Sequence, residues 1–211
     1  MNYKRVLVLA PHTDDAELGA GGTIARLVEE GSEVFVVAFS TAVDSRPPGT
    51  PEDVLKKEFF QALPTLGVKA SNLIAYEYPV RRLSYHRQEV LEELVVLRRR
   101  IEPDLVLLPS GQDVHQDHQV IHAEGLRACR NQTLLGYELP WNHITFSAQA
   151  FVVLHRRHVE MKWQAMQAYR SQFELERPYF SQEFIDGLAR VRGTQVNVEW
   201  AEAFEVLRIK M

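Results

Sequence analysis

Short apolar runs alternate with segments of helical periodicity in the first part of the chain. Residues 6–10 and 34–39 are continuous apolar runs rich in β-branched side chains, which is typical of buried strands. Between them, residues 18–30 place apolar side chains at helical spacing and are followed by Gly31, a residue type that commonly ends helices. The pattern predicts one strand–helix–strand unit.

The same alternation continues through the middle of the chain. Residues 51–66 predict a second helix that ends at Gly67, and residues 72–75 predict a short strand. Residues 84–101 form the clearest amphipathic pattern, closed by Pro103, and residues 104–108 predict another buried strand.

The rest of the chain is less regular. We expect strands at 144–146, 151–154 and 203–209, and helices at 157–172 and 181–190. No repeat or low-complexity linker divides the chain, so residues 1–211 are expected to form a single domain. Strands that alternate with helices predict a three-layer, Rossmann-like α/β fold with a mostly parallel sheet, whose functional loops lie at the carboxyl ends of the strands.

Composition narrows the class of protein. The formal net charge of −4 argues against a nucleic-acid binder, and Cys129 is the only cysteine, so no internal disulfide can form. The N-terminus has no signal-peptide pattern, and no apolar run approaches the roughly 18 residues of a membrane span. We therefore expect a cytoplasmic protein.

Two clusters of imidazole and carboxylate groups each follow a predicted strand. The first is Pro-His-Thr-Asp-Asp at 11–15, and the second is His-Gln-Asp-His at 115–118. Because parallel strands bring their carboxyl ends to one edge of the sheet, the clusters are expected to form one metal site. His12 and Asp15 would supply two ligands, and a third would come from His115, His118 or His122, a donor set that suits zinc.

Simpler interpretations exist for each cluster. Asp14 or Asp15 could cap the helix that follows the first cluster, and Asp117 could cap the helix after the second. The glycines at 19, 21 and 22 do not have the spacing of a dinucleotide-binding loop, and close packing of a helix on the sheet accounts for them better.

The sequence resembles the LmbE-like, or PIG-L, family of zinc-dependent N-deacetylases. The resemblance rests on residues 11–19 with Gly21-Gly22-Thr23, and on residues 115–118. It extends more loosely to residues 169–172 and, near the end of the chain, to Arg192-Gly193 and residues 201–204.

The resemblance implies a role for each member of the two clusters. His12, Asp15 and His118 would hold the zinc ion, and Asp14 would be the general base that deprotonates the attacking water. His115 would face the developing oxyanion or act as an acid, oriented by Asp117. The implied reaction removes the acetyl group from an N-acetylated amino sugar, such as a conjugate of N-acetylglucosamine.

Substrate recognition is less clearly marked. The family usually has proline where Thr13 and Gln116 stand, and commonly has a substrate-binding arginine where this chain has Leu55, followed by Lys56 and Lys57. Aromatic and polar groups after the second cluster, together with a later arginine, are expected to contact the sugar. These candidates are Tyr137, Glu138, Trp141, Asn142 and Arg192. Alternatively, the aromatic side chains pack against the core and the arginine is an ordinary loop charge.

Two other functions are compatible with the motifs. A phosphoesterase could use a carboxylate-rich magnesium or manganese site, although two imidazoles favour zinc. A non-catalytic module for sugars or nucleotides could retain the metal for structure, although Asp14 would then be unnecessary as a ligand. Exposed aromatics between residues 141 and 146 would also permit assembly into a homo-oligomer.

Overall fold

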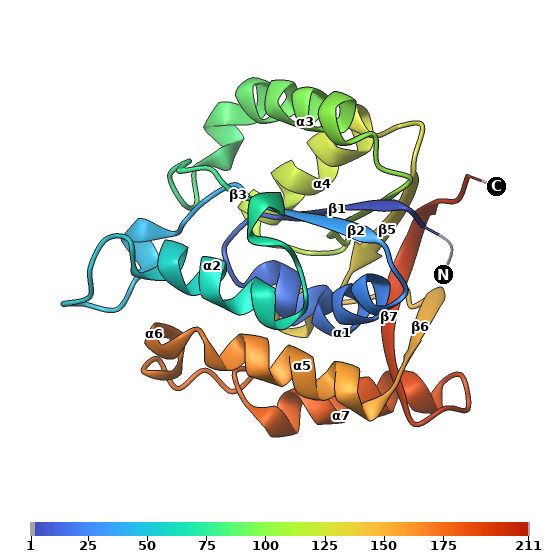
Figure 1. Ribbon diagram of the computed structural model, residues 1–211. Helices are drawn as coiled ribbons and strands as arrows, with labels where there is room; N and C mark the ends of the chain where they lie inside the picture. Colours follow the sequence, from blue (N-terminus) through green and yellow to red (C-terminus); the bar gives the residue numbers. More distant parts are fainter. Residues whose placement is uncertain (1–2, 211) are drawn as a thin grey trace.

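The computed structural model describes residues 3–210, which form a seven-stranded sheet with helices on both faces (Figure 1). The strand order is β3-β2-β1-β4-β5-β7-β6, with β7 antiparallel to both of its neighbours and the remaining pairs parallel. The expected α/β class with a mostly parallel sheet is confirmed. The strands are β1 (Arg5–Ala10), β2 (Glu33–Ala38), β3 (Leu73–Ala75), β4 (Leu105–Pro109), β5 (Thr133–Tyr137), β6 (Ala150–Leu154) and β7 (Trp200–Arg208).

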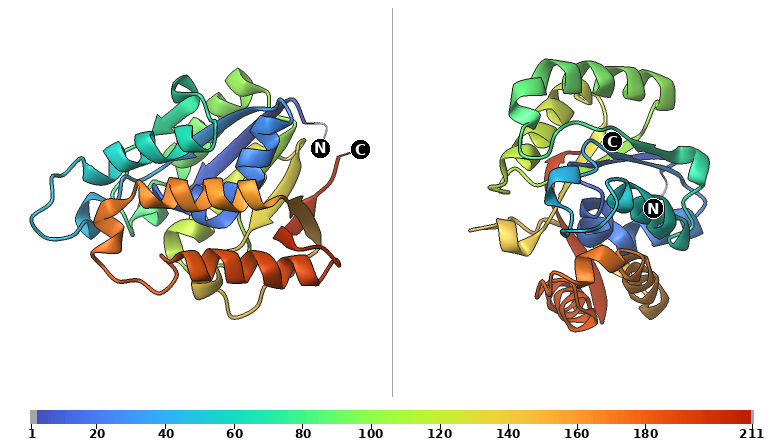
Figure 2. Two further views of the ribbon diagram at one scale, coloured as in Figure 1. Left: turned by 60° about the horizontal axis from the view of Figure 1, so that its bottom comes forward. Right: turned by 90° about the vertical axis from the view of Figure 1, so that its left-hand side faces the viewer.

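The helices form the two outer layers. Figure 1 and the end-on view in Figure 2 show α3 and α4 on one face of the sheet and α1, α2, α5 and α7 on the other. Two apolar clusters fill the two interfaces, one on each side of the buried strands β1 and β4. The helices are α1 (Asp15–Glu29), α2 (Val54–Thr65), α3 (Arg87–Ile101), α4 (Gln116–Ala128), α5 (Arg156–Gln167), α6 (Arg170–Phe173) and α7 (Gln182–Thr194).

Helix α1 contains a kink that the sequence pattern did not indicate. Ala20 has φ −145° inside the helix, and the backbone N–H groups of Gly22 and Thr23 donate to the carboxylate of Glu202 on β7, at 3.0 and 2.7 Å. The Glu202 carboxylate therefore substitutes for helix carbonyls at the start of the second half of α1. A methyl group on Gly19 would lie only 2.3 Å from a ring carbon of Tyr137, which confirms close packing as the reason for glycine there.

Several expected elements differ from those observed. Residues 144–146 form no strand, because Ile144 is 90% exposed and only His143 makes an isolated bridge, to Asp113. No strand was expected at β5, which lies between β4 and β7 in the sheet. The helix expected at 157–172 is divided into α5 and α6. No helix in the described part of the chain is long and apolar enough to cross a membrane.

Candidate metal centre

The two polar clusters meet because β1 and β4 are adjacent parallel strands. Val6 pairs with Leu105 and Val8 with Leu107, so the loop that follows β1 and the loop that follows β4 lie at the same edge of the sheet. The first loop carries His12 and leads into α1. The second leads into α4 through His115, whose Nδ1 accepts the backbone N–H of Asp117 at the start of that helix.

Three side-chain atoms form a compact triangle at this edge. His12 Nδ1 lies 3.1 Å from Asp15 Oδ2, His118 Nε2 lies 3.3 Å from the same oxygen, and the two nitrogens are 3.3 Å apart. A tetrahedral zinc ion with ligand bonds of about 2.0–2.1 Å holds its ligand atoms about 3.3 Å from one another. The geometry of His12, Asp15 and His118 therefore fits a zinc ion.

A carboxylate orients each of the two imidazoles. His118 Nδ1 lies 2.7 Å from Asp113 Oδ2, and His12 Nε2 lies 3.0 Å from Asp117 Oδ2. Each contact occupies the ring nitrogen that points away from the triangle and leaves the other nitrogen available. Histidine ligands of metals are commonly oriented by a carboxylate in this way.

A second donor set also lies within reach of a metal ion. Ligand nitrogens of His12, His115 and His118 can be chosen within 4.8 Å of one another. The triangle that contains Asp15 is tighter, and Asp15 is anchored by the His12 backbone N–H, which donates to its Oδ2 at 2.8 Å. We therefore favour Asp15 over His115 as the third ligand.

The electrostatic field of the cluster attracts positive charge. Burial lowers the pKa of both histidines of the triangle, but neighbouring carboxylates outweigh it and raise the pKa of His12 to about 9 and that of His118 to about 10. Burial would raise the pKa of Asp15, yet the same two imidazoles hold it well below its usual range. A cation placed between these groups would be favoured by the same carboxylates.

Asp14 stands beside the triangle without belonging to it. It occupies the N-cap position of α1, but its side chain makes no capping hydrogen bond, so capping does not account for this residue. Burial and the charge of Asp15 raise the pKa of Asp14 to about 6. A carboxylate with a pKa near neutrality is suited to exchange protons with a substrate.

His115 is oriented differently from the other histidines. Its Nδ1 accepts the Asp117 backbone N–H at 3.2 Å, whereas the Asp117 carboxylate contacts His12 and the backbone N–H groups of Arg81 and Leu83. Burial and the two neighbouring histidines lower the pKa of His115 to about 4. The ring is therefore neutral at pH 7, with its proton on Nε2. The backbone N–H of Asp117 thus contacts His115, whereas its carboxylate contacts His12.

A buried tyrosine holds the loop in which proline is replaced by Thr13. The hydroxyl of Tyr169 donates to the carbonyl of Thr13 and also lies 2.6 Å from Oε1 of the fully buried Glu17. Ser171, two residues further along, binds the buried Glu58 through its backbone N–H and its hydroxyl. Tyr169 thus holds the first loop at Thr13, whereas Ser171 ties the same segment to α2.

A cleft of about 280 Å³ opens over the cluster. Two of the expected substrate contacts, Trp141 and Asn142, line it. The Trp141 ring stacks on Tyr179 at a centroid distance of 3.7 Å, and Asn142 Nδ2 donates to Asp113 at 3.3 Å. The cleft thus places an aromatic pair beside the polar floor.

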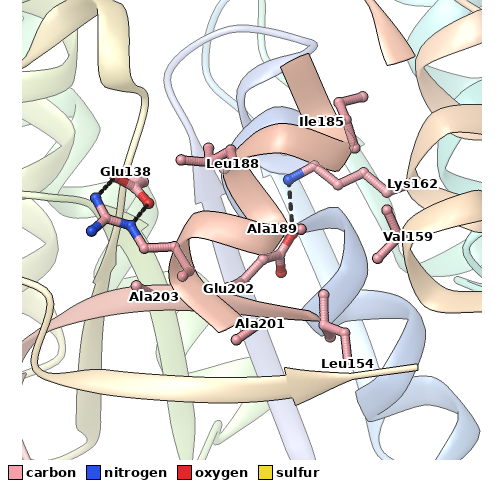
Figure 3. A pocket seen from close by; sticks show the side chains of 12 residues that line it. Glu138, Leu154, Val159, Lys162, Ile185, Leu188, Ala189, Ala201, Glu202 and Ala203 are labelled. Atoms are coloured by element: carbon pink, nitrogen blue, oxygen red, sulfur yellow. Dashed lines mark hydrogen bonds and ion pairs between the residues drawn. The ribbon is translucent and has the colours of Figure 1, made fainter. Parts of the chain in front are cut away.

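The other three expected contacts do not line this cleft. Tyr137 is fully buried in β5, and its hydroxyl donates to the carbonyl of Leu9 at 2.9 Å. Glu138 and Arg192 form a two-point ion pair at 2.7 and 2.6 Å, beside a separate cavity of about 10 Å³ (Figure 3). That space is close to the minimum for one water molecule, so it is too small for a sugar.

The structure shows where the residues next to the family's arginine position lie, and where His122 lies relative to the triangle. Leu55 lines the cleft and is buried, whereas Lys56 and Lys57 lie outside it and pair with Glu77 and Asp53. Neither lysine occupies the place expected for the family's arginine. His122 also stays away from the triangle, with its Nδ1 2.8 Å from the Pro109 carbonyl.

Several residues of this site were not expected from the sequence. Asp113 lies five positions before His118, in the loop that leads to the second cluster. Its acidic side chain was the only sequence feature that could have indicated a role. Arg81, Arg177 and Tyr179 line the cleft from segments that carry no motif. Only the folded arrangement brings these residues to the cluster.

Known families and structures agree with this fold. The family described as PIG-L, GlcNAc-PI de-N-acetylase, matches residues 7–129, more than half of the chain. A protein of *Escherichia coli* named uncharacterized deacetylase YaiS is 26% identical over 80% of this chain and 91% of its own. The diacetylchitobiose deacetylase of *Thermococcus kodakarensis* is 28% identical over 84% of this chain and 75% of its own.

Solved structures share the architecture over almost the whole chain. The N,N'-diacetylchitobiose deacetylase of *Pyrococcus horikoshii* superposes with a TM-score of 0.81 at 22% identity, covering 98% of this chain and 84% of that one. GalB, the 4-carboxy-2-hydroxymuconate hydratase of *Pseudomonas putida*, superposes with a TM-score of 0.80 at 21% identity, covering 99% and 98%. At such identities the likeness concerns the fold alone, and the fold evidently serves more than one reaction.

The family match distinguishes between the two reactions named for these structures, deacetylation and hydration. The matched family and both relatives are named as deacetylases, so the expected class of enzyme, a hydrolase of N-acetyl groups, is confirmed. The match includes both polar clusters, at residues 11–15 and 115–118. The chain belongs to the PIG-L family.

Proposed function

We propose that this protein is a zinc-dependent hydrolase that removes the acetyl group from an N-acetylated amino sugar. The observation that carries the proposal is the triangle of His12 Nδ1, Asp15 Oδ2 and His118 Nε2, with edges of 3.1–3.3 Å, under an open cleft. Two imidazoles and one carboxylate favour zinc over magnesium, which prefers oxygen ligands. Three protein ligands are also the usual number in a catalytic zinc site.

The residues of the triangle would hold the metal, and their partners would keep them in place. When bound, zinc supplies a Lewis acid and lowers the pKa of water to about 7. Asp113 and Asp117 hold the two histidines by the ring nitrogens opposite the triangle. This arrangement fixes the direction of both lone pairs before a metal arrives.

Asp14 is the proposed proton carrier. Its carboxylate would accept a proton as water attacks the acetyl carbon, and would return that proton to the sugar nitrogen as the carbon–nitrogen bond breaks. The products are acetate and a free amine. The absence of a capping bond at Asp14 supports this role, because the side chain is not committed to the helix.

His115 is proposed to stabilise the developing oxyanion by hydrogen bonding. Because its Nδ1 accepts the Asp117 N–H, a neutral ring carries its proton on Nε2 and can donate it to a carbonyl oxygen. Loss of one such donor typically costs about a hundredfold or more in rate.

The proposed substrate class rests on the relatives and on the wall of the cleft. One relative is named for diacetylchitobiose, and a protein of *Bacillus anthracis* that is 24% identical is named as a probable N-acetyl-α-D-glucosaminyl L-malate deacetylase. The stacked Trp141 and Tyr179 offer an apolar surface with polar neighbours, which suits a sugar ring. We also infer that residues 1–211 act as one domain, since β5, β7 and β6 extend the sheet that carries the metal centre.

The decisive test separates metal binding from turnover. Protein loaded with zinc should contain about one equivalent of metal and release acetate from N-acetylglucosamine conjugates. Asp14→Asn should retain the zinc and lose about a hundredfold to ten-thousandfold in kcat, the usual contribution of a general acid–base group. His118→Ala should lose the zinc itself.

Asp186→Asn is the matched control, because Asp186 pairs with Arg156 outside the cleft. It should change neither property. If Asp14→Asn released acetate at the wild-type rate, the proton-carrier role would be wrong. A wild-type protein that holds zinc but cleaves no acetylated sugar would favour a binding module instead.

A further inference from the structure

The side chains of the loop that follows β1 are not all held in the same way. His12 contacts the Asp117 carboxylate at 3.0 Å, and Asp15 accepts the backbone N–H of His12 at 2.8 Å. Among residues 3–210, the carboxylate of Asp14 has no hydrogen bond or ion pair with another residue, and it bonds only to its own backbone N–H. The position of the Asp14 side chain therefore depends on the backbone that carries it.

The peptide group that precedes Asp14 is bound by Tyr169. The carbonyl of Thr13 and the N–H of Asp14 belong to the same planar peptide group and point in opposite directions. The hydroxyl of Tyr169, which is fully buried, donates to this carbonyl, while the N–H faces the Asp14 carboxylate. A donor on the carbonyl also strengthens the N–H as a donor, because hydrogen bonds in a chain polarise one another. Tyr169 thus acts on the group that holds Asp14.

The buried Glu17 sets the direction of the Tyr169 hydroxyl. Its Oε1 lies 2.6 Å from the hydroxyl oxygen, and a phenol has only one hydrogen to donate. Because the Thr13 carbonyl can only accept, that hydrogen belongs to the bond with Thr13, and Glu17 supplies the hydrogen of the other bond. The second oxygen of Glu17 is buried without a hydrogen-bond partner among residues 3–210, which also disfavours a charged carboxylate. The hydrogen bonds therefore run in one direction, from Glu17 through Tyr169 to Thr13.

The segment that carries Tyr169 is anchored to the core. It connects α5 to α6, on the face of the sheet where α5 packs against α1 (Figure 1). Two residues further on, the backbone N–H and the hydroxyl of Ser171 bind the buried Glu58 of α2, at 2.8 and 2.6 Å. Tyr169 therefore reaches the loop from a fixed support and can hold the loop in one orientation.

We propose that Tyr169 is a positioning residue for Asp14, because it holds the peptide group between Thr13 and Asp14 so that the Asp14 carboxylate faces the reacting groups. This inference rests on the proposed function, in which Asp14 carries the proton. Without the hydroxyl the peptide group can rotate, and misplacement of a reacting group by about 1 Å can reduce a rate about a hundredfold. The proposed zinc ligands would be less affected, because His12 and Asp15 keep their own contacts.

Tyr169→Phe tests this role, because the substitution removes the hydroxyl and keeps the ring. With an N-acetylglucosamine conjugate as substrate, kcat should fall about tenfold to a hundredfold, while KM stays within about twofold. KM should be retained because Tyr169 does not line the cleft. The zinc content should remain about one equivalent. An unchanged kcat would overturn the inference, and so would loss of zinc or an effect confined to KM.

Tyr137→Phe is the matched control. Tyr137 is also fully buried, and its hydroxyl donates to a backbone carbonyl just before the same loop, that of Leu9 in β1, at 2.9 Å. This variant loses a buried hydroxyl of the same kind, but the peptide group next to Asp14 keeps its donor. Its kcat should therefore stay within about twofold of the wild-type value. Equal falls in kcat for both variants would indicate a general effect of losing a buried hydrogen bond, and the inference would be wrong.

Hydrogen–deuterium exchange gives a second measurement that does not depend on turnover. In Tyr169→Phe, peptides that cover residues 11–18 should exchange faster, while unchanged exchange in β1 and β4 shows that the fold is intact. Unchanged exchange at residues 11–18 would contradict the inference. Acetate release by the wild type together with a normal rate for Tyr169→Phe would remove only this inference. A wild type that releases no acetate would remove the proposed function, and the exchange data would still decide whether Tyr169 holds the loop.

Discussion

Two of the clusters of buried ionisable groups in this protein differ in how their charged side chains are arranged. In the first, Lys162 pairs with Glu202 at 2.7 Å, and both side chains are more than 90% buried (Figure 3). Glu202 also accepts two backbone N–H groups of α1, and the cavity beside the pair measures about 10 Å³. Every charge there has a partner of opposite sign.

The metal centre also pairs imidazoles with carboxylates, but there several potential ligand atoms converge on one point. Three potential ligand atoms converge within 3.1–3.3 Å, and the cleft above them is about 280 Å³. The carboxylates of Asp113 and Asp117 orient His118 and His12 so that the other ring nitrogen of each imidazole faces the same point. In this molecule, a buried charged side chain is therefore not by itself evidence of a functional site. Several potential ligand atoms that converge beside an open cleft are such evidence.

The largest expected effect would separate stability from metal binding. Lys162→Met leaves Glu202 buried without its cation, and we expect the free energy of unfolding to fall by about 3–5 kcal/mol. Zinc affinity of the folded protein should stay within about twofold, because none of the proposed ligands contacts Lys162. Chemical denaturation and zinc titration measure the two quantities.

Lys57→Met provides the matched control for that substitution. Lys57 pairs with Asp53 on the surface, where an ion pair contributes at most about 1 kcal/mol. If Lys162→Met weakened zinc binding as strongly as it reduced stability, the two clusters would be coupled and the contrast between them would fail.

An intermediate effect is expected at the residue that orients His118. Asp113→Asn keeps the shape of the side chain but removes the negative charge next to His118 Nδ1. Zinc affinity should fall about tenfold to a hundredfold, as is usual for the partner of a metal-binding histidine. The measurement is competition with a chelator of known affinity, and an unchanged affinity would show that Asp113 has no orienting role.

The smallest effect is expected at Lys56 and Lys57, which the sequence offered as possible replacements for the family's arginine. Lys56→Met and Lys57→Met should leave kcat/KM unchanged, because both lysines lie outside the cleft and are paired with carboxylates. Steady-state kinetics with an N-acetylglucosamine conjugate measures this. A severalfold rise in KM would place a lysine in the substrate site after all.

Local patterns predicted the parts of the fold that depend on nearby residues. The strand expected at 6–10 and the helix expected at 84–101 correspond to β1 and α3, whose continuous apolar runs and regular spacing need no information from distant segments. β5 was missed because its five residues include Gly136 and follow a polar turn, so burial between β4 and β7 determines this strand. That omission also led to Tyr137 being taken for a substrate contact.

Some residues of the candidate site could likewise be predicted from the sequence, whereas others could not. His12, Asp15 and His118 follow two strands whose pairing can be inferred from chain order, so their convergence could be anticipated. Arg177 and Tyr179 reach the cleft through the packing of α6, and Glu138 is matched to Arg192 through the packing of α7 against β7. Contacts of this kind depend on tertiary distances that spacing along the chain does not contain.

The contact between Glu202 and α1 has a consequence for the order of synthesis. Every proposed zinc ligand lies within residues 12–118, whereas the carboxylate that supports the kinked helix α1 lies at residue 202. A ribosome that has produced only the region matched by the family has therefore made all the ligands but not the support of the helix that begins with Asp15. The second half of α1 can therefore gain its support from Glu202 only late in translation.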